Sequence, residues 1–134
     1  MGQNLNRQIC CPVRLAAQRK PDGIALFDSH QTINYAQLDQ AAEAALANLM
    51  EAGIKPGNTV ALLGRNSFDY AVLFFAALRL GCRLLLLNCR LRASDWDKQI
   101  SKSEAGLLIC GREFAADAAS LDINRAIMED FRIG

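Results

Sequence analysis

Three short apolar runs constrain the fold of this chain more than any other feature of its sequence. They are Thr59–Leu63, Arg83–Leu87 and Leu107–Cys110. Beyond the first residue, each run is apolar without alternation, whereas a strand with one face in water alternates apolar and polar residues. Each run also has the length of a strand. The runs therefore predict an open, mainly parallel sheet with helices on both faces.

The segments between these runs have helical patterns. After the first run, Asn66 or Ser67 can cap a helix over residues 68–80, and a further helix over residues 93–102 follows the second run. Strands and helices that alternate with short connections are typical of a doubly wound α/β layer, in which each crossover is right-handed. We therefore predict the α/β class.

A β-hairpin is predicted before this layer. Its strands cover residues 24–28 and Thr32–Asn34, and His30 falls in the exposed turn between them. Asn34 then begins a long helix, because Gln37 lies three residues later, at the spacing of a capping box.

The two ends of the chain carry weaker patterns. Residues 1–11 are expected to form a flexible lead-in before a helix over residues 12–20. Toward the C-terminus, helical patterns cover residues 114–119 and residues 124–130. No repeat or interior linker divides the sequence, so residues 1–134 are expected to form a single domain.

The composition excludes several classes of function. Fifteen Lys plus Arg are balanced by fourteen Asp plus Glu, which leaves a net charge of +1 and gives no support for nucleic-acid binding. The longest apolar run, residues 70–78, is far shorter than the roughly 20 residues that a membrane-spanning helix needs. We expect no membrane partner and a cytoplasmic location.

Cysteine and histidine offer little chemistry. Five Cys without a C-x-x-C pair, and a single His, predict no metal site. Cys82 and Cys110 lie in or beside apolar runs and are interpreted as small buried hydrophobic residues. Cys89 has Arg90 beside it, which would lower the pKa of a thiol, but no base is placed to use it. We assign no catalytic residue.

Ligands of open α/β sheets bind beyond the carboxyl ends of the strands. Those positions hold weak candidates for an anion site, namely Arg65, Asn66, Ser67 and Arg90, with Arg112 after the last run. The alternative is that Asn66 and Ser67 only cap a helix and that the arginines are solvated. The glycine-rich phosphate motifs and the G-x-S-x-G elbow are absent, so no cofactor-binding residue is assigned.

Six short segments carry a family resemblance. They are residues 19–26 (RKPDGIAL), 32–38 (TINYAQL), 53–61 (GIKPGNTVA), 66–67 (NS), 76–81 (AALRLG) and 87–91 (LNCRL). In this order they resemble the start of the AMP-binding, adenylate-forming enzymes, a family that includes the acyl-CoA synthetases. The family often has proline where this chain has Leu86 and Cys89.

The resemblance implies a reaction that joins a carboxylic acid to CoA with ATP and Mg²⁺. ATP would adenylate the carboxylate and release pyrophosphate, and the CoA thiol would then attack the mixed anhydride to give a thioester. The family's phosphate loop and C-terminal lid lie beyond position 134. The chain is therefore expected to be an N-terminal scaffold that holds no cofactor of its own and is inactive alone.

Two alternatives stay open. The chain could be a free-standing α/β module that binds a phosphorylated metabolite at its arginine-bearing loops, or a non-catalytic partner that completes the sheet of another chain. An apolar face or edge left uncovered would also favour self-association.

Overall fold

The computed structural model describes residues 11–131. The lead-in expected over residues 1–11 therefore lies outside the described residues, apart from Cys11. The elements in chain order are α2 (Pro12–Arg19), β1 (Ile24–Phe27), β2 (Thr32–Asn34), α3 (Tyr35–Glu51), β3 (Thr59–Leu63), α4 (Phe68–Leu80), β4 (Arg83–Leu87), α5 (Ala93–Ser103), β5 (Leu107–Cys110), η1 (Arg112–Phe114), α6 (Ala115–Ala118), β6 (Asn124–Ile127) and α7 (Met128–Phe131).

A parallel sheet with the strand order β4-β3-β5-β6 forms the centre of the fold. The three apolar runs lie side by side in it, with Val60 of β3 opposite Leu84 of β4 and Leu107 of β5. The β1–β2 hairpin is antiparallel and forms a separate two-stranded sheet. The predicted α/β class, with a preceding hairpin, is confirmed.

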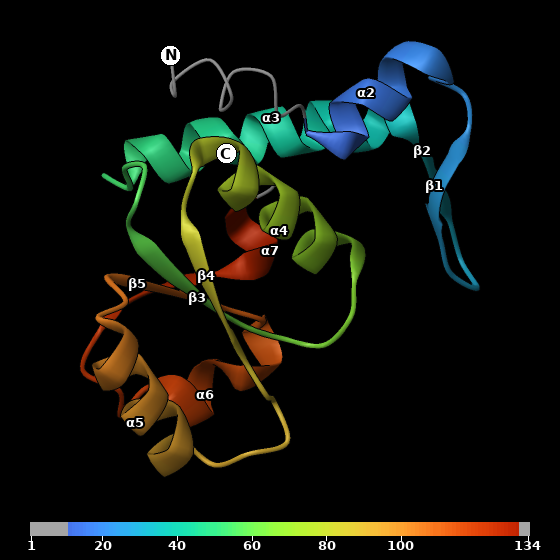
Figure 1. Cartoon of the computed structure of the whole chain (residues 1–134). Coiled ribbons are helices and arrows are strands. Elements are labelled where there is room, and N and C mark those ends of the chain that lie inside the picture. Colours follow the sequence, from blue (N-terminus) through green and yellow to red (C-terminus); the bar gives the residue numbers. More distant parts are fainter. Residues whose placement is uncertain (1–10, 132–134) are drawn as a thin grey trace.

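Helices cover both faces of this sheet, with α3 and α4 on one side and α5 and α6 on the other (Figure 1). Val60 and Leu62 belong to the apolar cluster that the first pair of helices closes. Ala61 and Leu63 belong to the opposite cluster, together with Trp96 of α5. All five residues of β3 are buried. The absence of alternation in this run therefore has a direct cause, since neither face of the strand meets water.

Local capping sets where the main helices begin and end. The Asn34 side chain accepts a hydrogen bond from the Gln37 backbone N–H at 2.8 Å, and the Gln37 side chain accepts one from the Asn34 N–H at 2.9 Å. This is the predicted capping box. At the other end of the next helix, Gly81 has φ +88°, a left-handed conformation that glycine adopts without strain and that ends α4.

The predictions near the C-terminus were partly wrong. Residues 124–130 were expected to be helical, but Asn124–Ile127 is strand β6, and only Met128–Phe131 is a helix. The strand forms because its backbone pairs in parallel with β5, with Ala126 opposite Ile109. Four residues have too little periodicity to reveal such long-range pairing. Residues 114–119 form a 3-10 turn and the four-residue α6 in place of one continuous helix.

The capping box gives a prediction about stability. Replacing Asn34 by Ala removes the acceptor for the Gln37 N–H, so we expect the free energy of unfolding to fall by about 1 kcal/mol in urea titrations. Gln40→Ala is the matched control, because Gln40 is exposed on the same helix and makes no cap. Equal losses in the two variants would contradict a role of the cap in stability.

Candidate functional site

Arg65 follows β3 at the carboxyl edge of the sheet, as predicted, but acidic and aromatic side chains already engage it. Its Nε lies 3.1 Å from Glu113 Oε2. Its guanidinium carbon also lies 5.7 Å from the centre of the Phe114 ring, within cation–π range. Both partners come from η1, directly after β5. The positive charge of Arg65 is therefore balanced by the neighbouring loop.

Arg112 has the same kind of environment. Its guanidinium donates to Asp130 Oδ1 at 2.6 Å, and its backbone N–H donates to Glu129 Oε1 at 2.9 Å. Both acids lie on α7, the segment after β6. Two of the three arginines at this edge are thus paired with carboxylates of the next loop along the sheet, an arrangement that disfavours anion binding.

Ser67 has the capping role that the simpler interpretation gave it. Its Oγ accepts a hydrogen bond from the Tyr70 backbone N–H at 3.1 Å, which begins α4. Asn66 is exposed beside it. Arg90 is also exposed, and its backbone N–H donates to Asn88 Oδ1 at 2.9 Å in a tight turn. Within residues 11–131 we find no ion pair of Arg90 and no contact that joins it to Arg65.

An aromatic series fixes these loops relative to one another. Trp96 donates its indole N–H to the Asn88 carbonyl at 2.9 Å, which holds the loop after β4. The Trp96 ring meets Phe114 edge to face, with centroids 6.4 Å apart, and Phe114 in turn lies under Arg65. Trp96 is a packing residue of the core, since only 2% of it is exposed.

A shallow pocket of about 500 Å³ lies between β1 and the first half of α4. Phe27, Phe68 and Phe74 are among the residues that line it, with Asn66 and Ser67 also in its wall. No cationic side chain lines the pocket, so it has apolar character and does not suit a phosphate group.

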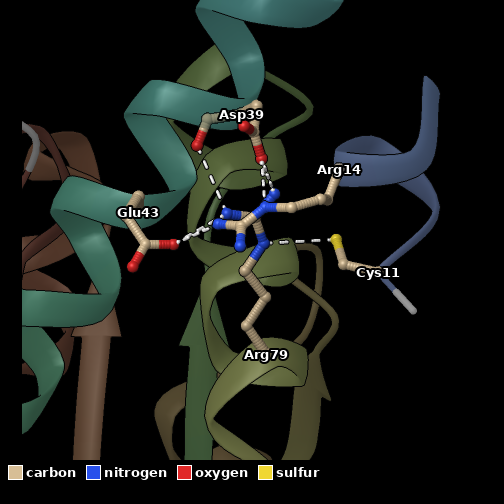
Figure 2. A network of polar contacts seen from close by, with 5 residues as sticks. All are labelled: Cys11, Arg14, Asp39, Glu43 and Arg79. Atoms are coloured by element: carbon tan, nitrogen blue, oxygen red, sulfur yellow. Dashed lines mark hydrogen bonds and ion pairs between the residues drawn. The ribbon is translucent and has the colours of Figure 1, made fainter. Parts of the chain in front are cut away.

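A polar network that sequence reasoning missed joins three helices (Figure 2). Arg79 of α4, whose side chain is only 6% exposed, pairs with Asp39 and, at 3.1 Å, with Glu43, both on α3. Its Nε also donates to Cys11 Sγ at 3.2 Å. From α2, Arg14 reaches the same two carboxylates at 3.3 and 2.6 Å. Because both ions of each pair are held on helices, the network docks α2 and α4 against α3.

The network shifts the ionisation of its members. Partial burial raises the pKa of Asp39, but hydrogen bonds from Arg79 and Arg14 and their positive charges outweigh burial and hold it below its ordinary value. Burial likewise raises the pKa of Cys11, while the hydrogen bond from Arg79 and nearby backbone N–H groups lower it overall. Burial raises the pKa of Cys82 and Cys110, which are buried as predicted.

Neither a metal-binding cluster nor a membrane-spanning helix is found among the described residues. Across residues 11–131, no group of three or more His, Cys, Asp or Glu side chains is arranged to bind a metal ion. In the same part of the chain, no helix has both the length and the apolar character needed to cross a membrane. His30 lies exposed in the hairpin turn, where its backbone N–H donates to Asp28 at 2.7 Å.

Comparison with known proteins identifies relatives for most of the chain. A family model described as AMP-binding enzyme matches residues 13–131. The chain is 37% identical over 95 residues to 2-succinylbenzoate–CoA ligase of Geobacillus kaustophilus, an alignment that covers 71% of this chain and 19% of that protein. It is 32% identical over 108 residues to enterobactin synthase component E of Escherichia coli, covering 81% and 20%.

A solved structure has the same fold. O-succinylbenzoate coenzyme A synthetase from Bacillus subtilis, in complex with AMP, superimposes with a TM-score of 0.85 and 24% sequence identity over 91% of this chain and 32% of that chain. The same synthetase has also been solved with ATP and magnesium ion. The chain spans about a fifth of the length of the curated relatives it matches.

The network predicts a specific dependence of stability on pH. Because the pKa of Asp39 is lowered in the folded state, its ionised carboxylate stabilises the fold. This stabilisation is fully present above the ordinary Asp pKa, near 4, and is lost as the pH falls through the pKa of the folded state. We expect Asp39→Asn to lower the free energy of unfolding by about 1–3 kcal/mol at pH 7. The difference from wild type should shrink as the pH falls below about 4.

Urea titrations at a series of pH values measure this difference. Asp122→Asn is the control, because Asp122 is exposed and has no hydrogen bond or ion pair recorded in the described part of the chain. A loss for Asp39→Asn that stays constant down to pH 2 would show that its charge does not stabilise the fold.

Proposed function

The chain belongs to the family of AMP-binding enzymes, and on that premise we propose that it forms the N-terminal scaffold of an ATP-dependent carboxylate–CoA ligase. In this reaction the carboxylate attacks the α-phosphorus of ATP, which releases pyrophosphate and forms an acyl adenylate. The CoA thiol then attacks the acyl carbon, so that AMP leaves and a thioester forms. The family match over residues 13–131 is the observation that carries the proposal.

Within the family, 2-succinylbenzoate is the proposed acid. Two relatives of that name are 37% and 33% identical to the chain. The simple stretch over residues 87–110 also resembles the o-succinylbenzoate–CoA ligases of menaquinone synthesis. The proposed location is the cytoplasm, where ATP and CoA are supplied.

We assign this stretch a structural role because its described residues do not fit a site for ATP and Mg²⁺. No acidic cluster is arranged to bind the metal within residues 11–131. At the carboxyl edge of the sheet, Arg65 and Arg112 are paired with Glu113 and Asp130. The groups that bind ATP, Mg²⁺, CoA and the acid are therefore proposed to come from outside this stretch.

The exposed Arg90 favours one alternative, a module that binds a phosphorylated metabolite. Of the candidate anion residues, Arg65 is paired with an acid and Ser67 caps a helix, which leaves Arg90 and Asn66. A single exposed arginine binds a phosphate weakly, since its charge is screened by water and salt. We therefore rank this alternative below the scaffold.

The scaffold proposal predicts that the 134-residue chain alone does not adenylate an acid. Incubated with ATP, Mg²⁺, CoA and 2-succinylbenzoate, it should give no AMP above a blank without protein, because no described residue is placed to stabilise the reacting phosphate. The 2-succinylbenzoate–CoA ligase of Geobacillus kaustophilus, assayed in parallel, is the positive control. AMP formation that depends on this chain would place catalytic groups within it.

Calorimetric titration distinguishes the alternative. For a scaffold we expect no saturable heat with ATP, AMP or CoA at millimolar concentration. Binding that Arg90→Gln abolishes, and that Arg83→Gln leaves intact, would favour the metabolite-binding module. Arg83 is the matched control because it is exposed on the strand that precedes this loop.

A further inference from the structure

Helix α2 packs along α3 with little apolar contact (Figure 1). Val13 is the one buried residue of this helix, and Leu15, its largest apolar side chain, is 38% exposed. An eight-residue helix is not stable by itself in water, because so few hydrogen bonds do not offset the cost of forming its first turn. The docked helix therefore relies on the polar contacts that α2 makes with its neighbours.

Arg14, in the first turn of α2, makes two ion pairs with α3. Its guanidinium reaches Asp39 Oδ1 at 3.3 Å and Glu43 Oε1 at 2.6 Å. These two acids are four residues apart in the sequence, so they lie on the same face of α3. Figure 2 shows Arg14 reaching this pair of carboxylates from α2, while Arg79 reaches it from α4. A single side chain thus links α2 to both acids.

The two arginines that share these acids differ in their access to water. The Arg14 side chain is 46% exposed, whereas that of Arg79 is 6% exposed. Dissolved salt screens exposed charges strongly and buried pairs much less. Rising ionic strength therefore weakens the ion pairs between α2 and α3 before it weakens those between α4 and α3.

The other end of α2 is attached without charged groups. The Ala36 N–H donates to the Pro21 carbonyl at 3.1 Å, and the Tyr35 N–H donates to the Gly23 carbonyl at 2.9 Å. Both bonds join the chain after α2 to the start of α3, and neither involves an ion that salt would screen. The contacts of Arg14 can therefore open while residues 21–23 stay in place.

We propose that α2 is a detachable cover of the Arg79 network, released from α3 and α4 as the ionic strength rises. Arg14 then leaves the two acids, and Cys11 leaves the Arg79 Nε that donates to it. The helix unravels up to residues 21–23, while Arg79 keeps α3 and α4 together through Asp39 and Glu43. The result is a switch between a covered and an open Arg79. It does not depend on the catalytic assignment.

Hydrogen exchange of the 134-residue chain, read by mass spectrometry, tests the proposal. Between about 0.05 M and about 1 M NaCl, we expect the amide hydrogens of residues 13–19 to exchange at least about threefold faster. Peptides from α3 and α4 should keep their exchange rates, because the ion pairs of Arg79 are buried. An α2 rate that does not respond to salt would overturn the proposal. Equal acceleration in all three helices would also overturn it, since the whole fold would then be opening.

Variants of two arginines on the same helix test the role of Arg14. Arg14→Gln should give fast exchange in α2 at low salt and remove its salt dependence, because the screened ion pairs are gone. Arg19→Gln is the matched control: it removes the same charge from α2, at an exposed residue for which residues 11–131 show no ion pair. It should keep the salt dependence, and circular dichroism confirms that each variant is folded. Equal loss of salt dependence in the two variants would show that Arg14 does not hold the helix.

Discussion

Burial of β3 on both faces is the constraint on which the rest of the structure depends. Its side chains alternate between two apolar clusters, with Val60 and Leu62 in one and Ala61 and Leu63 in the other. A strand in this position needs a helical layer on each side and a neighbouring strand at each edge. The crossover through α4 leads from β3 to its neighbour β4, and the crossover through α5 leads from β4 to the other neighbour, β5, so together they supply all four.

The elements that were predicted well are those whose signals are local. The box formed by Asn34 and Gln37, for example, depends on two residues only three positions apart. Strand β6 could not be predicted, since its four residues form a strand only through pairing with β5. The Arg79 network was missed for the same reason. Arg79 lies 40 residues from Asp39, and only the packing of α4 on α3 brings them together.

Arg65 and Arg112 lie at the carboxyl edge of the sheet, as expected, but beside acids that the sequence did not indicate. The rule that loops at the carboxyl ends of strands gather at one edge is confirmed by Arg65, which meets Glu113 from the loop after β5. In the sequence, each of these arginines follows its own strand, with no sign of which side chains lie beside it in space. The sequence could not show that the same edge gathers acids as well, such as Asp130 beside Arg112. Because the loops meet at one edge, Glu113 and Asp130 lie beside Arg65 and Arg112 and balance their positive charges.

Large apolar side chains are exposed on two strands of the described residues. Phe27 and Ile24 are exposed on the separate hairpin, and Leu86 is exposed on an edge strand of the main sheet. Each of these elements pairs with a strand on one side only among the described residues. Strand pairing and apolar contact need such open edges, whereas catalysis needs a concave site with unpaired polar groups. Among residues 11–131, the exposed apolar side chains of Leu86 and of the hairpin lie on such strands.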